Sequence, residues 1–89
     1  MQAVISVVGK DKVGILKDVA TKCADHNVNI IDVSQTVLRD MFTMIMLVDI
    51  PQINVKFGDF SEEMENYGKA IGMEIRAMHE DIFNSMHRI

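Results

Sequence analysis

Two β-rich segments with almost nothing between them constrain the fold most. Residues 28–39 and 41–50 are rich in β-branched and other apolar side chains, and the dipeptide Asp40-Met41 forms their junction. A connection this short joins antiparallel strands, because parallel strands need a crossover of a dozen or more residues. The sequence therefore predicts a hairpin in the middle of the chain, with Asp40 as a turn residue.

An amphipathic helix is predicted on each side of this hairpin. Residues 13–26 carry apolar side chains every three or four positions, with charged side chains on the other face. Residues 55–71 repeat this spacing more clearly. Gly58 and Gly68 each cost about 1 kcal/mol of helix propensity relative to alanine. The second helix therefore either begins near Asp59, with a capping box formed by Asp59 and Glu62, or is maintained by packing.

The order of elements predicts one α+β domain over residues 1–89. Two short βαβ crossovers around a hairpin give a ferredoxin-like βαββαβ plait, a four-stranded antiparallel sheet with both helices on one face, followed by a short C-terminal helix. The predicted elements are strand 2–8, helix 13–26, strand 28–39, strand 41–50, helix 55–71, strand 73–78 and helix 80–88.

Composition argues against several classes of partner. The net charge is −4 and the nine Lys and Arg residues are scattered, which is unlike a nucleic-acid-binding surface. No apolar run approaches the roughly 20 residues that span a bilayer. The only cysteine, Cys23, has no internal disulfide partner, and the histidine spacing does not match a metal site. We expect a cytoplasmic protein without signal peptide, metal or cofactor.

Both faces of the predicted third strand are apolar. One parity of residues 42–48 carries Phe, Met, Met and Val, and the other carries Thr, Ile and Leu. A large apolar sheet face usually marks a partner surface. We therefore expect a homodimer, with an interface formed by Ile31, Val33, Phe42, Met44, Met46 and Phe83. The alternative is a monomer whose C-terminal helix covers the open face of the sheet.

The loop before the first helix is the candidate ligand site. Gly14 would let a ligand approach the exposed N–H groups at the helix N-terminus, which suit an amino-acid carboxylate. Asp11, or the side-chain carbonyl of Asn29 at the start of the second strand, which we expect on the same sheet edge as the loop, would accept hydrogen bonds from the ammonium group. The same residues also fit a structural explanation, in which Gly14 is a packing glycine, Asp11 caps the helix and Asn29 bonds its own backbone.

The segments Gly9-Lys10-Asp11-Lys12-Val13-Gly14-Ile15-Leu16 and Asn27-Val28-Asn29-Ile30 resemble the corresponding loop and strand entry of ACT domains. The resemblance covers essentially the whole chain and is strongest to small ACT proteins of uncharacterised role, relatives of the ACT repeats in the glycine-cleavage repressor. It implies a pocket for a free amino acid, commonly between two such domains. The implied contacts are Asp11, Lys12, Val13, Gly14, Ile15 and Asn29.

The predicted function is thus a regulatory module, not an enzyme, that acts on a separate protein. Acylphosphatases share the plait but need an arginine in the first loop, where this chain has Lys10 and Lys12. RNA-binding plaits expose stacking aromatics, and Phe42 is the only aromatic residue on a predicted strand. A heavy-metal carrier would need Cys-x-x-Cys in the first loop. A dimeric interaction subunit without a ligand remains an alternative.

Overall fold

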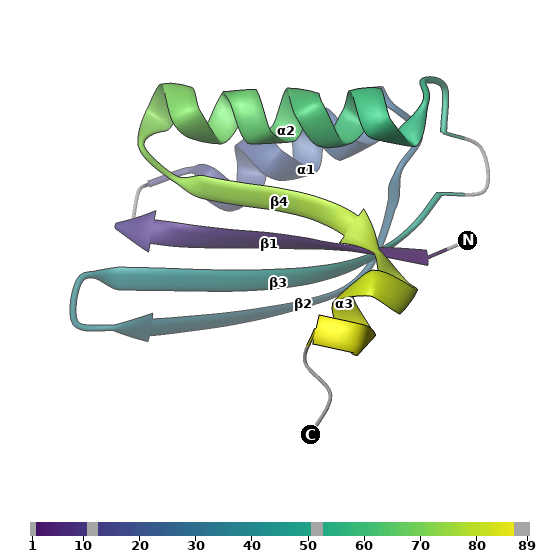
Figure 1. Ribbon diagram of the computed structural model, residues 1–89. Coiled ribbons are helices and arrows are strands. Elements are labelled where there is room, and N and C mark those ends of the chain that lie inside the picture. The colour runs from purple at the N-terminus through teal and green to yellow at the C-terminus, as the bar shows by residue number, and fades with distance from the viewer. Residues whose placement is uncertain (1, 11–12, 51–52, 87–89) are drawn as a thin grey trace.

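The computed structural model describes residues 2–10, 13–50 and 53–86. Its elements, in chain order, are β1 (Gln2–Lys10), α1 (Ile15–Asp25), β2 (Asn29–Leu38), β3 (Met41–Asp49), α2 (Phe57–Ile71), β4 (Glu74–His79) and α3 (Glu80–Met86) (Figure 1). The predicted βαββαβ order with a C-terminal helix is confirmed. Residues 87–88 of the predicted last helix lie outside the described residues.

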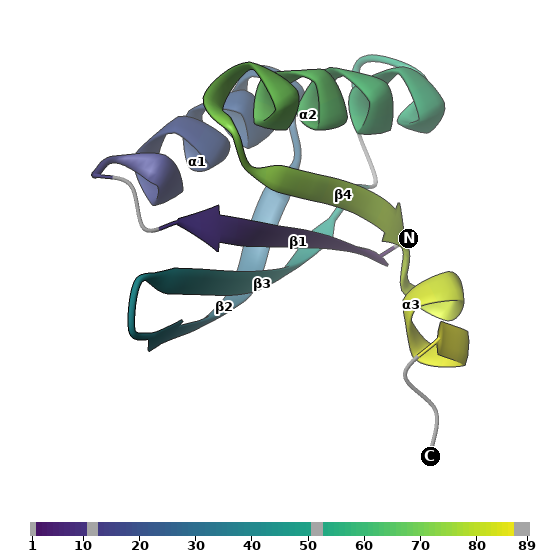
Figure 2. The ribbon, with the colours of Figure 1, turned by 60° about the vertical axis from the view of Figure 1, so that its left-hand side comes forward.

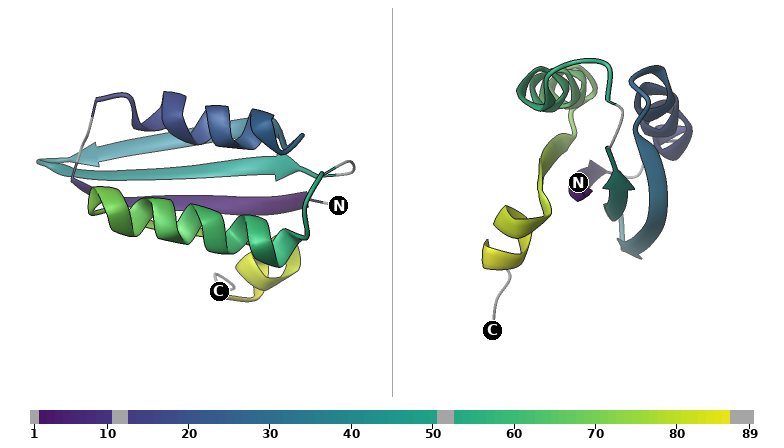
Figure 3. Two further views of the ribbon diagram at one scale, coloured as in Figure 1. Left: turned by 90° about the horizontal axis from the view of Figure 1, so that it is seen from above. Right: turned by 90° about the vertical axis from the view of Figure 1, so that its right-hand side faces the viewer.

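The four strands form one antiparallel sheet in the order β2-β3-β1-β4. Helices α1 and α2 lie side by side over one face (Figure 3), and α3 lies beyond the other face (Figures 1 and 2). This is the ferredoxin-like arrangement expected from the sequence. We call the face away from α1 and α2 the open face.

The core lies between the sheet and the two long helices. Its buried side chains come from both helices and from one parity of each inner strand: Ile15, Val19 and Cys23 of α1, Phe60 and Met64 of α2, Ala3, Ile5 and Val7 of β1, and Phe42, Met44, Met46 and Val48 of β3. The apolar periodicity thus marked the buried face of α2 correctly. In α1 it was only partly right, because Val13 and Leu16 are exposed whereas Ile15 is buried.

Both long helices begin at a different residue than the sequence predicts, and their glycines have different roles. Gly14 adopts φ 84° and ψ 4°, so α1 begins at Ile15 instead of residue 13. Helix α2 begins at Phe57 and includes both of its glycines, so it does not begin at Asp59. A Cβ at Gly68 would lie 2.6 Å from the carbonyl oxygen of Met73, which shows that this glycine permits close contact between α2 and the start of β4.

The strand register identifies the residues of the open face. Directly opposed residues in a sheet point to the same side. Ser6 of β1 pairs with Ile45 of β3 and with Arg76 of β4, and none of these three side chains is in the core. The open face therefore carries Gln2, Val4, Ser6, Val8 and Lys10 of β1, Met41, Thr43, Ile45, Leu47 and Asp49 of β3, Asn29, Asp32, Ser34, Thr36 and Leu38 of β2, and Glu74, Arg76 and Met78 of β4.

Candidate functional site

The N-terminus of α1 has the backbone geometry expected of an anion site. Gly14 lies in the left-handed region, and its carbonyl oxygen accepts a hydrogen bond of 3.0 Å from the Asp18 N–H. Among the described residues, no side chain caps this helix end. The N–H groups of the first turn have no acceptor within the helix, and the helix dipole gives them a partial positive charge. This end of α1 can therefore attract a carboxylate.

Gly14 is required for its conformation and not for contact with another side chain. A Cβ at this position would meet nothing within 4 Å, but the positive φ is one that L side chains rarely adopt. The structural explanation in which Gly14 is a packing glycine is therefore wrong. The open space around Gly14 leaves its backbone accessible to a ligand.

The residues around Gly14 divide into an exposed and a buried group. Val13 is fully exposed, and Leu16 is 37% exposed. Ile15 is 5% exposed and belongs to the core, so its side chain anchors the helix and does not line a surface site. Asp11 and Lys12 lie outside the described residues. Of the predicted contacts near this loop, Val13 and the Gly14 backbone are the ones that the structure places at the surface.

Asn29 lies far from Gly14 in the same chain. Strand β1 runs parallel to β2, because both are antiparallel to β3. Asn29 opposes Asp49 at one end of the sheet, whereas Lys10, which leads into the loop, opposes Met41 at the other end. The ten residues of β2 separate these ends by about 30 Å. The expectation that Asn29 and the loop share one sheet edge is therefore wrong.

The predicted dimer interface also needs correction. Phe42 is 3% exposed, and Met44 and Met46 are fully buried beneath α1 and α2. Because both parities of β3 are apolar, the sequence did not reveal which one faces the helices. Val33 opposes Met46 on the helix side and packs against the core, while Ile31 lies at a β-bulge and is 47% exposed.

The sixth predicted interface residue, Phe83 of α3, belongs to a groove on the open face. The groove has a volume of about 380 Å³ and lies between α3 and the strands β1, β3 and β4. Its walls are mainly apolar, and its lining residues are Ser6, Val8, Thr43, Ile45, Glu74, Arg76, Met78, Phe83 and Met86. The strand residues of this groove were not predicted from the sequence. The pattern that could have indicated them is the second apolar parity of residues 42–48, which includes Thr43 and Ile45.

A polar cluster joins the C-terminal end of α1 to α2. His26 Nδ1 lies 2.9 Å from Asn54 Oδ1, and His26 Nε2 lies 2.9 Å from Glu63 Oε2. The hydrogen bonds to Asn54 and Glu63 raise the pKa of His26 despite the opposing effect of burial. The three residues are distant in sequence, so no local motif could have indicated this cluster.

The remaining polar groups do not resemble a catalytic or metal centre. Burial raises the pKa of the Cys23 thiol to about 11, which keeps it neutral and unreactive. Tyr67 Oη donates a hydrogen bond of 2.9 Å to Asp18, and Lys22 lies over its ring, on the outer surface of α1 and α2. Within residues 2–10, 13–50 and 53–86, no three His, Cys, Asp or Glu side chains cluster as metal ligands would.

No helix in the described part of the chain has the length and apolar character needed to cross a membrane.

Three comparisons relate the chain to known proteins. A UPF0237 protein of Clostridium acetobutylicum is 45% identical over 89 residues, which is the full length of both chains. The structure of an ACT domain protein from Streptococcus pneumoniae matches with a TM-score of 0.80 and 40% identity over 93% of each chain. A putative glycine cleavage system transcriptional repressor matches 85% of this chain and 43% of its own, with a TM-score of 0.71 and 23% identity, which shows a shared fold.

The family model of the ACT domain matches residues 1–78, which include the candidate anion site and the whole sheet except its last residue. The predicted resemblance is thereby confirmed. The chain belongs to the ACT domain family and, within it, to the small proteins named UPF0237.

Proposed function

We propose that this protein is a regulatory module that binds a free amino acid and acts, as a homodimer, on a separate partner protein. ACT domains are typically regulatory modules that bind small ligands such as amino acids. The observation that carries the proposal is the N-terminus of α1, which Gly14 leaves open in its left-handed conformation.

The amino-acid carboxylate would bind at this helix end. The backbone N–H groups of the first turn converge there, and they favour an anion through both hydrogen bonds and the helix dipole. A neutral apolar ligand would gain nothing from these donors. The positive charge of Lys12 would add to the attraction, and the exposed side chain of Val13 would contact the ligand.

The ammonium group would bind Asp11. Of the two acceptors considered from sequence, Asn29 is at the far end of the sheet, whereas Asp11 is only three residues from Gly14. A carboxylate is also the stronger partner for an ammonium group, since a charge-assisted hydrogen bond is roughly twice as strong as a neutral one. One short loop would thus recognise both charges of a zwitterion.

Regulation requires the ligand to favour one arrangement of the protein over another. A second copy of the chain is the simplest partner for such a change, since several large apolar side chains of the described chain are exposed, among them Ile31, Leu38, Met41, Ile82 and Met86. An effector protein would then respond to the arrangement of the dimer.

A thermal-unfolding panel of free amino acids at millimolar concentration tests the proposal. A ligand at about a hundred times its dissociation constant adds roughly 2.7 kcal/mol to the free energy of unfolding, which raises the Tm of a chain this short by about 10 °C or more. Asp11→Asn should abolish the shift. Asn29→Ala is the matched control, and it should keep the shift.

Each result of this panel has a definite meaning. A shift that disappears in Asp11→Asn and persists in Asn29→Ala supports the loop site. A shift lost in Asn29→Ala alone contradicts it, because the site would then lie at the other end of the sheet. A panel without any shift contradicts amino-acid binding and favours a dimeric interaction subunit.

A further inference from the structure

The open face of the sheet is only partly covered. Helix α3 contacts β1 and β4, and Val4, which points to the open face, is 5% exposed at that end of the sheet. Towards the β2–β3 hairpin, Met41 is 48% exposed and Leu38 is 73% exposed on the same face. Figure 2 shows α3 and this hairpin at opposite ends of the sheet.

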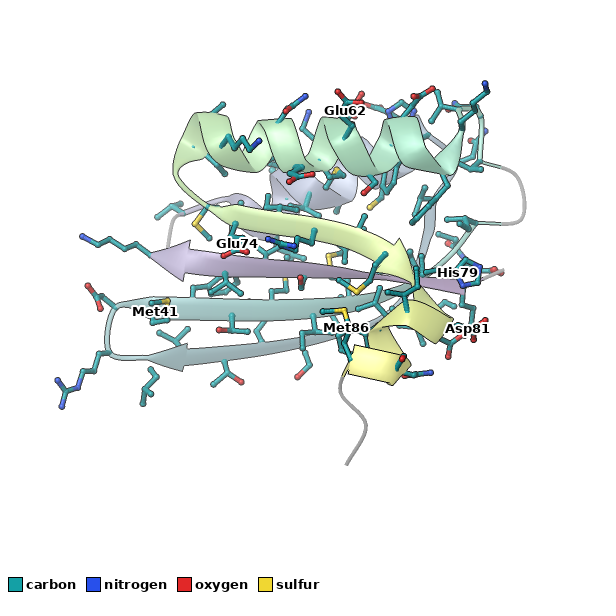
Figure 4. All side chains as sticks on the ribbon, in the orientation of Figure 1. Met41, Glu62, Glu74, His79, Asp81 and Met86 are labelled. Atoms are coloured by element: carbon teal, nitrogen blue, oxygen red, sulfur yellow. The ribbon has the colours of Figure 1, made fainter. Side chains whose placement is uncertain are left out.

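Helix α3 forms a ridge beside the groove. Ile82 and Met86 are four residues apart and therefore lie on the same side of the helix. They are 55% and 64% exposed, and no residue of α3 is buried. Figure 4 shows Met86 on α3 next to the sheet, and Met41 far from it at the hairpin end. The ridge thus carries two apolar side chains that remain largely exposed to solvent in the single chain.

We infer that two copies of this chain associate through their open faces, with α3 of each copy in the groove of the other. The inference rests on the homodimer of the proposed function but not on the amino-acid ligand. A twofold axis makes each contact occur twice, so it requires a surface that is complementary to itself. A ridge and a groove side by side on one face meet this requirement.

The size and chemistry of the face fit a second copy. The two longer extents of the molecule, 36 and 33 Å, limit the open face to at most roughly 1,200 Å², and a standard interface takes about 800 Å² from each partner. The centre is apolar, with Ile45, Met78 and Phe83 in the groove. Glu74 and Arg76 form an exposed ion pair of 3.0 Å on the open face of the edge strand β4, and such polar groups are typical of an interface rim.

Single charges in the ridge or the groove test this interface. Ile82→Glu places a charge on the ridge, and Ile45→Lys places one in the groove. Each variant should be monomeric in analytical ultracentrifugation at about 50 µM, where the wild type should be a dimer. Val37→Glu is the matched control, because Val37 is 54% exposed but opposes Phe42 on the helix side of the edge strand β2. It should remain dimeric.

Mixing the two monomeric variants gives a sharper test. In a mixed dimer, the lysine introduced in the groove of one copy would meet the glutamate introduced on the ridge of the other, and the second ridge and groove would both be native. Equimolar Ile82→Glu and Ile45→Lys should therefore form a dimer that neither forms alone. An interface at any other surface would not be restored by this mixture.

The possible outcomes separate the inference from the proposed function. A monomeric wild type overturns the inference and the homodimer. A dimer that survives Ile82→Glu and Ile45→Lys but is lost in Val37→Glu overturns only the open-face interface and points to the edge of β2. If either variant loses its far-UV circular dichroism, Ile82→Asp replaces Ile82→Glu, or Thr43→Lys replaces Ile45→Lys, and the same results decide.

Discussion

His26 contacts Glu63 and Asn54 so that each nitrogen of its ring lies next to a side-chain oxygen. Nε2 lies 2.9 Å from a carboxylate oxygen of Glu63, and Nδ1 lies 2.9 Å from the side-chain oxygen of Asn54. The amide of Asn54 is oriented by its other end, because its Nδ2 donates a hydrogen bond to the carbonyl oxygen of Asp25. Both partners of the ring are therefore acceptors, and the network favours the protonated imidazolium.

This network predicts that the protein loses stability as the pH rises. The hydrogen bonds to Asn54 and Glu63, with the charges of Glu63 and Asp25, raise the pKa of His26 above its value in the unfolded chain. The stabilisation is complete below the unfolded pKa, near 6.5, and is lost as the pH rises through the raised pKa of the folded state. Thermal unfolding between about pH 5.5 and 8.5 should show this decline.

His26→Gln isolates the contribution of the histidine. At about pH 5.5 the variant should be less stable than the wild type by about 1 kcal/mol, since Glu63 is partly exposed and the ion pair is screened. The difference should shrink as the pH approaches about 8.5, because the wild-type histidine becomes neutral. Glu63→Gln should also flatten the profile. A constant difference across the range would mean that the ring is held by packing against Phe60 and not by charge.

Two glycines of α2 should respond to alanine in opposite directions. Gly68→Ala places a methyl group 2.6 Å from the carbonyl oxygen of Met73 and about 3 Å from Ile75, so it should cost about 1–3 kcal/mol. Gly58→Ala meets nothing within 4 Å and should stabilise the protein by about 0.5 kcal/mol through helix propensity. Chemical denaturation of both variants measures these values. Equal effects would contradict the close packing assigned to Gly68.

Neighbouring residues of β3 should differ strongly in their effect on stability. Met44 is fully buried beneath the helices, so Met44→Ala should cost about 2–4 kcal/mol in urea denaturation. Ile45, on the other face, is 38% exposed, and Ile45→Ala should cost less than about 1 kcal/mol in the monomer. The reverse order would mean that the register places the wrong parity in the core.

The fold could be predicted from the sequence because its main signals are local. The short junction around Asp40 requires a hairpin, although its two turn residues are Arg39 and Asp40, and Met41 already belongs to β3. The spacing from Phe57 to Ile71 requires a helix with one apolar face. Packing then shifted the boundaries by one or two residues. Gly58, for example, lies inside α2 although propensity alone suggested a later start.

The site could be predicted only in part, because it depends on relations between strands. Gly14 was visible as a glycine at the start of the first predicted helix, but its left-handed conformation was not predicted. The position of Asn29 depends on β1 and β2 being parallel to each other, which the hairpin alone does not reveal. The two apolar parities of β3 differ only through what covers them, so a periodicity of two residues could not separate Met44 from Ile45.

The final prediction links amino-acid binding to dimer formation. Strand β1 connects the two sites directly: Val8 lines the groove, and Lys10, two residues later, leads into the loop before Gly14. A ligand bound at this loop should therefore change the affinity of the groove for the α3 ridge of the second copy. Coupling energies between sites typically correspond to factors of about 5 to 150 in affinity.

We expect the amino acid that gives the largest thermal shift to change the dissociation constant of the dimer at least about fivefold. Linkage requires the dimer to change the affinity for that amino acid by the same factor, because both describe one coupling free energy. Ultracentrifugation at saturating ligand gives the first factor. Calorimetric titration of the wild type and of the monomeric Ile82→Glu variant gives the second. If neither the dissociation constant of the dimer nor the affinity for the amino acid changes, the loop and the open face act independently. Regulation would then have to pass through α1 to a different partner.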